Sequence, residues 1–347
     1  MFKRIHDIIY NKEIDDSLCN DINIISNIKI LCRKAFAEQD DESLLEVHQV
    51  LYQINIAHLA VPWEKSAVNL LHPLISSISR TINDCWEQSE RKKYHELLSN
   101  IPDASNFESW IRKFVDEHPK NYLHPIFPFL RDKASFAQMR DFFLQESPLE
   151  MLFGDIIAMM LPGVYSDMKA EISENFWDEV GHGKMNLVHR ELRGNIMKLL
   201  DIPKDCYINQ IELFERQELE LINTYLSAAI DRTKMSQQVG ALLATELMIP
   251  GRFVYQIEGW KRNGLPVENL KYLTDHVTVD AEHAEHWMEH VVMPLVNQHP
   301  SIIPEIVLGA ARRLDVAGRV CDQLYTRMQR VSKGSDARKE IASMAQA

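Results

Sequence analysis

The chain has 347 residues, only 12 of which are glycine, and the first glycine is Gly154. Phosphate-binding loops and tight hairpins need residues that adopt positive φ, so this scarcity argues against nucleotide-binding α/β folds and β-sandwiches. Acidic residues outnumber basic ones by 50 to 38, and the net charge of −12 disfavours binding to nucleic acid or to anionic membranes.

The remaining composition indicates a globular protein, which we expect in the cytoplasm. Hydrophobic residues make up 46% and charged residues 25% of the chain, as in ordinary globular domains. The five cysteines form no Cys-x2-Cys pair, which favours reduced thiols. The longest apolar stretch, residues 151–165, is interrupted by Asp155 and Pro162, so we expect no membrane-spanning segment.

Helical periodicity dominates the N-terminal third of the chain. Apolar residues spaced by three and four predict helices over 44–58 and 68–78, with Pro73 as a kink inside the second. A short helix over 107–115 follows. Three prolines then predict a helix-free connector (Pro119, Pro125 and Pro128). We therefore expect an N-terminal helical extension over residues 1–125.

The same periodicity continues beyond the connector and predicts an all-α bundle over residues 131–331, with a frayed polar tail at 332–347. Pro148 is expected to start a new helix, because proline is favoured in the first helical turn. The predicted helices cover 134–146, 148–161, 165–180, 185–200, 211–231, 234–249, 268–275 running into 276–293, and 303–331.

A histidine-rich segment is the first candidate metal site. Four of the 14 histidines lie between positions 276 and 290. On a helix that turns about 100° per residue, His276, Asp280 and His283 project from one face. Neutral imidazoles and a carboxylate in this arrangement suit iron, manganese or zinc. A solvated surface helix is the alternative, because three glutamates occupy the same stretch (Glu282, Glu285 and Glu289).

Two further segments carry candidate ligands. Glu179 and His189 flank Gly181 and Gly183, which would break a helix and bring both side chains to one point. A surface carboxylate and a buried histidine are the simpler interpretations of that pair. Glu246 is the only acid in a long apolar stretch, where an unpaired carboxylate is rare. Burial against a basic side chain from another helix would also explain it.

Together these segments offer three carboxylates and three imidazoles, the first shell expected for two irons in a helical bundle. The combined pattern of Glu-x-Gly-x-Gly-x5-His, an isolated Glu, and Gly-x7-Tyr-Leu-x2-His-x3-Asp-x2-His-x3-Trp resembles the haem-oxygenase-like diiron oxidases and oxygenases over about residues 131–300. The resemblance implies a haem-oxygenase-like helical bundle whose iron ligands are Glu179, His189, Glu246, His276, Asp280 and His283.

Two more residues are candidate ligands. Ferritin-like sites use Glu-x2-His pairs, and Glu179-x2-His182 with Asp280-x2-His283 would mimic them. Some relatives recruit an additional carboxylate from the preceding helix, for which Glu150 is the candidate. Glu146 would share its face only on a continuous helix, which Pro148 is expected to interrupt. No catalytic or cofactor-binding residue is predicted beyond the metal ligands.

The resemblance implies O2-dependent oxidation of a small organic substrate by two iron ions that cycle between Fe(II) and Fe(III). Longer relatives with an N-terminal extension include N-oxygenases of natural-product biosynthesis, which favours N-oxygenation of an amine or guanidine. The alternatives are desaturation or C–C cleavage of an amino acid or fatty acid. A metal-free helical binding protein on the same scaffold is the alternative of another class. An electron donor and a homodimer are the expected partners.

Two other activities of the scaffold are disfavoured. Haem breakdown needs a proximal histidine in the first helix of the bundle, and none lies between the proline connector and Gly181. A thiaminase-like hydrolase needs a reactive thiol, and the sequence around Cys206 shows no activating partner.

Overall fold

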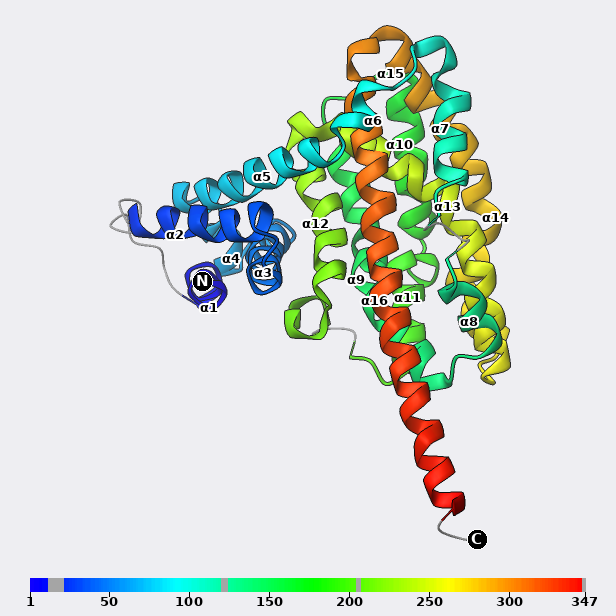
Figure 1. Ribbon diagram of the computed structural model, residues 1–347. Helices are drawn as coiled ribbons and strands as arrows, with labels where there is room; N and C mark the ends of the chain where they lie inside the picture. Colours follow the sequence, from blue (N-terminus) through cyan, green and yellow to red (C-terminus); the bar gives the residue numbers. More distant parts are fainter. Residues whose placement is uncertain (12–21, 120–123, 204–206, 345–347) are drawn as a thin grey trace.

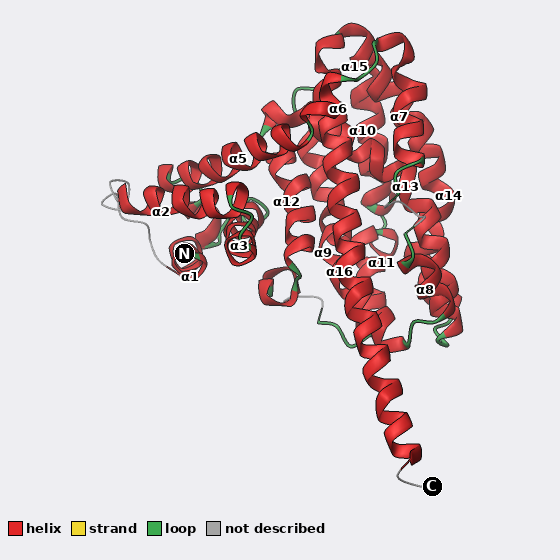
Figure 2. Cartoon of the chain, in the orientation of Figure 1, coloured by secondary structure: helices red, strands yellow, loops and turns green. Residues whose placement is uncertain are grey.

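The computed structural model describes residues 1–11, 22–119, 124–203 and 207–344. Within these ranges every regular element is a helix and no strand is present, as Figure 2 shows, so the all-α prediction is confirmed. Figure 1 shows a bundle of long helices with a smaller group of helices against one side. Cys206 lies outside the described residues.

The N-terminal helices pack around a hydrophobic cluster of their own. The helix predicted over 44–58 is α3, which begins where the Asp40 carboxylate accepts a hydrogen bond from the Ser43 amide at 2.9 Å. The kink predicted at Pro73 is wrong, because Pro73 is the first residue of α5, where its missing N–H is not needed. These elements are α1 (Phe2–His6), η1 (Asp7–Asn11), α2 (Ile22–Cys32), η3 (Arg33–Ala37), α3 (Asp41–Ala57), α4 (Lys65–Asn69) and α5 (Pro73–Lys93).

Three short helices follow, α6 (His95–Ser99), α7 (Phe107–Asp116) and α8 (Ile126–Asp132), with a 3-10 turn at Ala104–Asn106. The helix predicted over 107–115 is confirmed as α7. The proline connector is not helix-free as predicted, because α8 begins directly after Pro125 and holds Pro128 in its first turn. The boundary of the extension near residue 125 stays a prediction.

The bundle is built around α13, which packs against α16, α14 and α8, while α9 packs against α10, α11 and α12. The core of the bundle includes the fully buried side chains of Tyr225, Trp260 and Trp287. Beyond α8 the helices are α9 (Phe136–Met160), α10 (Ser166–Glu179), α11 (His189–Leu199), α12 (Arg216–Ile230), α13 (Met235–Arg262), α14 (Lys271–His286), η11 (Trp287–Val292), α15 (Met293–Gln298) and α16 (Ile303–Met344).

The helix break predicted at Pro148 is wrong, because α9 runs continuously through it. Two neighbouring polar groups bond to one carbonyl of the turn before the proline. The Ser147 hydroxyl donates to the carbonyl oxygen of Phe143 at 2.5 Å, and Arg193 Nη2 donates to the same oxygen at 3.2 Å. Glu146 and Glu150 are therefore one helical turn apart on the same face of α9.

Several predicted helix ends also differ from the structure. The helix predicted over 234–249 continues through Pro250 to Arg262, and the last helix continues past residue 331 to Met344. Its final turns project beyond the bundle in Figure 1. The helix predicted over 185–200 begins only at His189, and residues 211–213 form a 3-10 turn ahead of α12.

The close contact between α13 and α16 depends on two glycines, each of which faces the backbone of the other helix. A Cβ at Gly240 would overlap the carbonyl oxygen of Ile306, and a Cβ at Gly309 would overlap that of Gln237. We expect Gly240→Ala to lower the free energy of unfolding by about 1–3 kcal/mol or more, because overpacking a core usually costs this much. Urea denaturation of the purified variant measures this change.

Val254→Ala is the matched control, because it changes an exposed position of the same helix. An unfolding midpoint for Gly240→Ala within error of that for Val254→Ala would contradict the close helix packing.

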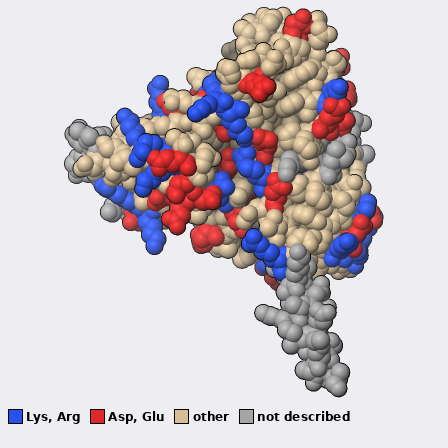
Figure 3. All heavy atoms as spheres, in the orientation of Figure 1, with Lys and Arg blue, Asp and Glu red and all other residues tan. Residues whose placement is uncertain are grey.

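Charged residues of both signs are intermingled on the face shown in Figure 3. Some of them join the N-terminal helices to the bundle. Arg91 of α5 contacts Glu305 of α16 at 2.7 Å, and Arg91 also pairs with Glu87 one turn away. Among the described residues, no helix is long and apolar enough to cross a membrane.

Candidate metal centre

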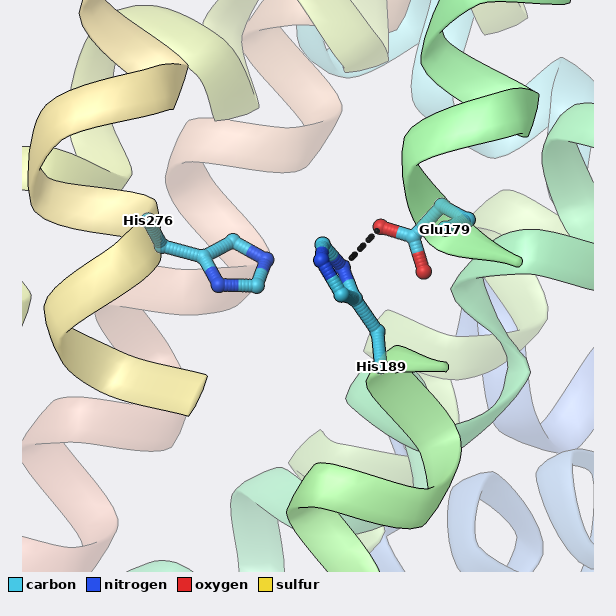
Figure 4. Close-up of side chains that lie close together, drawn as sticks. All are labelled: Glu179, His189 and His276. Atoms are coloured by element: carbon cyan, nitrogen blue, oxygen red, sulfur yellow. Dashed lines mark hydrogen bonds and ion pairs between the residues drawn. The ribbon is translucent and has the colours of Figure 1, made fainter. Parts of the chain in front are cut away.

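Three of the predicted ligands converge in the middle of the bundle (Figure 4). Glu179 is the last residue of α10, His189 is the first residue of α11, and His276 lies within α14. Each offers one ligand atom, and these atoms all lie within 4.8 Å of one another. His189 Nδ1 is 3.0 Å from Glu179 Oε1, and the two imidazole rings are 4.5 Å apart between centroids.

A tight turn between α10 and α11 produces this convergence. Gly181, His182 and Gly183 have φ values of +63°, +53° and +75°, which place three successive residues in the left-handed region. The chain reverses there, and the two helix ends meet. The helix break predicted at the two glycines is confirmed.

The turn makes Gly181 essential for the placement of His189. A Cβ at Gly181 would overlap the backbone of Leu187 and Val188, directly before that histidine. We expect Gly181→Ala to displace His189 and to lower iron affinity about 10-fold or more, since even changes around a metal's ligands cost about 10–100-fold. Equilibrium dialysis against Fe(II) under anaerobic conditions measures the affinity.

Gly183→Ala is the control for backbone strain alone. Gly183 also has positive φ, but a Cβ there would meet only the Trp177 ring, at 3.3 Å. Equal losses of iron affinity in the two variants would show that strain, and not displacement of His189, is responsible.

Glu179, His189 and His276 line a cavity in the bundle, which we call the metal cavity. Two more carboxyl groups line it, those of Glu246 from α13 and Glu150 from α9. Burial, together with the carboxyls of Glu179 and Glu171, raises the pKa of Glu246 to about 8. Burial and the neighbouring Glu146 raise the pKa of Glu150 to about 7, and the Tyr272 hydroxyl donates a hydrogen bond to Glu150. The charged groups that act on Glu246 are all carboxyls, so the alternative of burial against a basic side chain gains no support.

The imidazole of His276 is oriented for binding a metal. Its Nδ1 lies 2.7 Å from the carbonyl oxygen of Tyr272, to which it donates, so Nε2 is free of its proton. Burial and the neighbouring His189 lower the pKa of His276 to about 4, which keeps the ring neutral. Burial opposes protonation of His189 as well, but the Glu179 carboxylate outweighs it and raises the pKa of His189.

The remaining predicted ligands do not join the cluster of Glu179, His189 and His276. His283 lines the cavity, but its Nε2 is 2.9 Å from Asp178 Oδ2. His182 is exposed, stacks on Trp177 and pairs with the other oxygen of Asp178, so it lies outside the cavity. The side chain of Asp280 lies outside the described residues.

Asp178 is a site residue that sequence reasoning missed. It lies between His182 and His283 and contacts both. In the sequence, only its i, i+4 spacing from His182 indicates that Asp178 contacts a candidate ligand. Tyr272 was recognised only as part of the motif, although it contacts both Glu150 and His276.

The cavity between these residues has a volume of about 30 Å³. An outer pocket of about 210 Å³ adjoins it through His189 and His276 and is lined by Asp178, His182 and Asp275. The cavity thus collects carboxyl and imidazole donors from α9, α10, α11, α13 and α14, with Arg313 as the one arginine or lysine in its described wall, and an adjoining space lies next to His189 and His276. Hard carboxylates with imidazoles fit iron, and a pair of ions would offset the mutual repulsion of the acids.

Comparison with known proteins identifies the family of the chain. The model of the family described as iron-containing redox enzymes matches residues 140–318, which is more than half of the chain. The chain therefore belongs to this family of haem-oxygenase-like iron redox enzymes. The matched segment includes Glu150, Glu179, His189, Glu246 and His276. A search of the curated proteins found no match.

Proposed function

We propose that this iron-containing redox enzyme is a non-haem diiron oxygenase or oxidase that uses O2 to oxidise a small organic substrate. The observation that carries the proposal is the convergence of Glu179, His189 and His276 within 4.8 Å, beside the buried carboxyls of Glu150 and Glu246. Three ligands suffice for one ion only, whereas the additional carboxyls with His283 and Asp280 provide for two.

The reaction we favour is N-oxygenation of an amine or guanidine. Two bound Fe(II) ions would supply two electrons to O2 and the substrate nitrogen two more; one oxygen atom would enter the N–H bond, and the other would take up two protons from solvent and leave as water. An external electron donor must then return the ions to the ferrous state. The long N-terminal extension and the additional carboxyl of Glu150 support N-oxygenation through the resemblance to N-oxygenases.

The protein's own contribution is to enclose the reaction. Glu179, His189 and His276 come from three helices, and their positions are fixed by the α10–α11 turn and by the hydrogen bond from His276 to Tyr272. Leu149, Phe153 and Ile249 form the apolar part of the wall and exclude water from that side of the centre.

The iron content of the full-length protein tests the metal site. After anaerobic loading with Fe(II) and removal of excess metal, we expect about two Fe per chain, the number a diiron site needs. Mössbauer spectroscopy would then show a coupled pair after oxidation. Less than about one Fe per chain would overturn the proposal and favour the metal-free binding protein.

A substrate panel tests the reaction. Amines and guanidines are incubated with the Fe(II) protein and 18O2, and the products are analysed by mass spectrometry. N-oxygenation places labelled oxygen on nitrogen. An unlabelled product that has lost two hydrogens would instead support the desaturase alternative, and cleaved products would support the C–C-cleaving one. The absence of any N-oxygenated product would overturn N-oxygenation.

A further inference from the structure

A large pocket, which we call the extension pocket, lies between the N-terminal helices and the bundle. Its volume is about 370 Å³, and small-molecule sites usually measure about 300–1,000 Å³. Residues of α1, η1 and α3 form one side of its wall, and residues of α9, α11 and the 3-10 turns before α12 form the other. Among the described residues, none lines both this pocket and the metal cavity.

Gln53 of α3 lines this pocket and carries a side-chain amide without partners. The residue is 1% exposed, and neither the nitrogen nor the oxygen of the amide has a hydrogen-bond partner among the described residues. A buried polar group without a hydrogen bond is unfavourable, and folded proteins keep few of them. Because Gln53 lies in the wall of a pocket of ligand size, a bound molecule can supply the missing partners.

The hydroxyl groups of the two tyrosines in this wall are already bonded to the main chain. The Tyr10 hydroxyl donates to the carbonyl oxygen of Gln53 at 3.1 Å, and the Tyr52 hydroxyl donates to that of Ile208 at 2.6 Å. The second bond joins α3 to the turn before α12 and so connects the two sides of the pocket. The tyrosine rings, with the buried side chain of Leu152, present a mainly apolar surface beside the Gln53 amide.

The charged side chains of the wall do not require a charged ligand. Glu64 and Arg190 are both exposed to solvent, and Arg190 also lies 3.7 Å from Asp155. Burial raises the pKa of Tyr10 and that of Tyr52, which indicates surroundings of low polarity around both rings. A charged group is strongly disfavoured in such surroundings, so the pocket is suited to a neutral ligand.

We propose that the extension pocket binds a neutral, mainly apolar small molecule that carries a carboxamide or lactam group. The Gln53 nitrogen donates to the carbonyl oxygen of the ligand, and the Gln53 oxygen accepts from its N–H, so one edge of the ligand satisfies both groups. Glu179, His189 and His276 do not line the pocket, so this site is distinct from the metal centre. The inference does not depend on the proposed function.

Other ligand classes leave part of the Gln53 amide without a partner. A ketone satisfies the amide nitrogen but offers no donor to the amide oxygen. A carboxylate also offers only acceptors and brings a charge into apolar surroundings. A hydrocarbon fills the apolar part of the pocket and satisfies neither group.

Three naphthalene derivatives separate these possibilities. The carbonyl of 2-naphthamide carries an NH2 group, that of 2-acetylnaphthalene carries a methyl group in its place, and 2-naphthoate carries the charge. Isothermal titration calorimetry with the full-length protein prepared without metal measures their affinities. We expect 2-naphthamide to bind about 10-fold or more tightly than either analogue, because each analogue leaves the buried Gln53 oxygen unpaired.

Two variants assign this preference to the pocket. Gln53→Leu keeps a side chain of similar size and removes an unpaired buried amide, so it is expected to fold and to bind 2-naphthamide and 2-acetylnaphthalene equally. Ala60→Phe places a ring in the wall and should weaken the binding of all three compounds. Gln88→Leu, at an exposed position of α5, is the matched control and should keep the preference for the amide.

Several results would overturn the inference. They are the absence of saturable binding, equal affinities of the unmodified protein for 2-naphthamide and 2-acetylnaphthalene, an amide preference that survives in Gln53→Leu, and binding that Ala60→Phe leaves unchanged.

Repeating the titration anaerobically with Fe(II) separates the inference from the proposed function. We expect the same preference for the amide, whereas its loss on iron loading would place the compound at the metal centre and overturn the inference. A preference for the amide in protein that retains less than about one Fe per chain would support the inference and overturn only the diiron proposal.

Discussion

Replacing His276 with alanine is expected to abolish the iron site. The substitution removes a neutral, oriented imidazole that lies with Glu179 and His189 inside one 4.8 Å cluster. Because changes to groups around a metal's ligands already cost about 10–100-fold in affinity, loss of a ligand should cost at least about 100-fold. Iron retained after gel filtration should fall from about two to below about one Fe per chain, and O2 consumption should fall with it.

His286→Ala is the matched control for this experiment. His286 lies on the same helix, is exposed, and packs against His290 outside the cavity. It should retain iron like the unmodified protein. If His276→Ala binds two Fe with unchanged affinity, the metal centre lies elsewhere in the bundle.

The second large effect concerns stability without metal. Glu246→Gln is expected to stabilise the metal-free protein at pH 8 while weakening iron binding. Its pKa is about 8 in the folded protein, against an ordinary value of 4.5, so the folded state binds more protons than the unfolded state between these values. Stability therefore falls as pH rises through this window, by about 1.4 kcal/mol for each unit of pKa difference.

Urea unfolding of the metal-free protein at several pH values between 6.5 and 9 measures the effect. This range avoids the opposite contribution of His276, whose lowered pKa of about 4 reduces stability as pH falls below 6.5. Glu150, with its pKa raised to about 7, is retained in the variant. Between pH 6.5 and 9 the unmodified protein should lose about 2 kcal/mol more than Glu246→Gln.

Glu268→Gln serves as the control, because Glu268 is exposed at the start of a 3-10 turn. It should leave the pH dependence unchanged. Parallel stability curves for Glu246→Gln and the unmodified protein would mean that Glu246 is ionised in the fold and is not the destabilising acid.

Sequence periodicity was sufficient to predict the all-α fold, because the apolar stripes of helices such as α3 are local patterns. The meeting of Glu179 and His189 could also be foreseen, since two closely spaced glycines mark a reversal of the chain. Both features depend on residues close together in the sequence.

Features that depend on distant residues were not predictable in the same way. Pro148 is predicted to start a new helix, but Arg193 from α11 bonds to a carbonyl of the preceding turn and α9 continues. A second interior cavity, next to the metal cavity, combines residues from α9, α12, α13 and α16, and no spacing in the sequence relates its residues Glu218 and Arg313. Their proximity follows from helix packing alone.

The continuity of α9 has a consequence for motion near the metal centre. Pro148 has no N–H to bond to the carbonyl of Leu144, so α9 lacks the rung of its hydrogen-bond ladder that would join these two residues. Bending at that point therefore breaks one backbone bond fewer than bending elsewhere in the helix. A bend there would move Glu150, to which the Tyr272 hydroxyl donates a hydrogen bond, relative to the segment of α9 that Arg193 contacts.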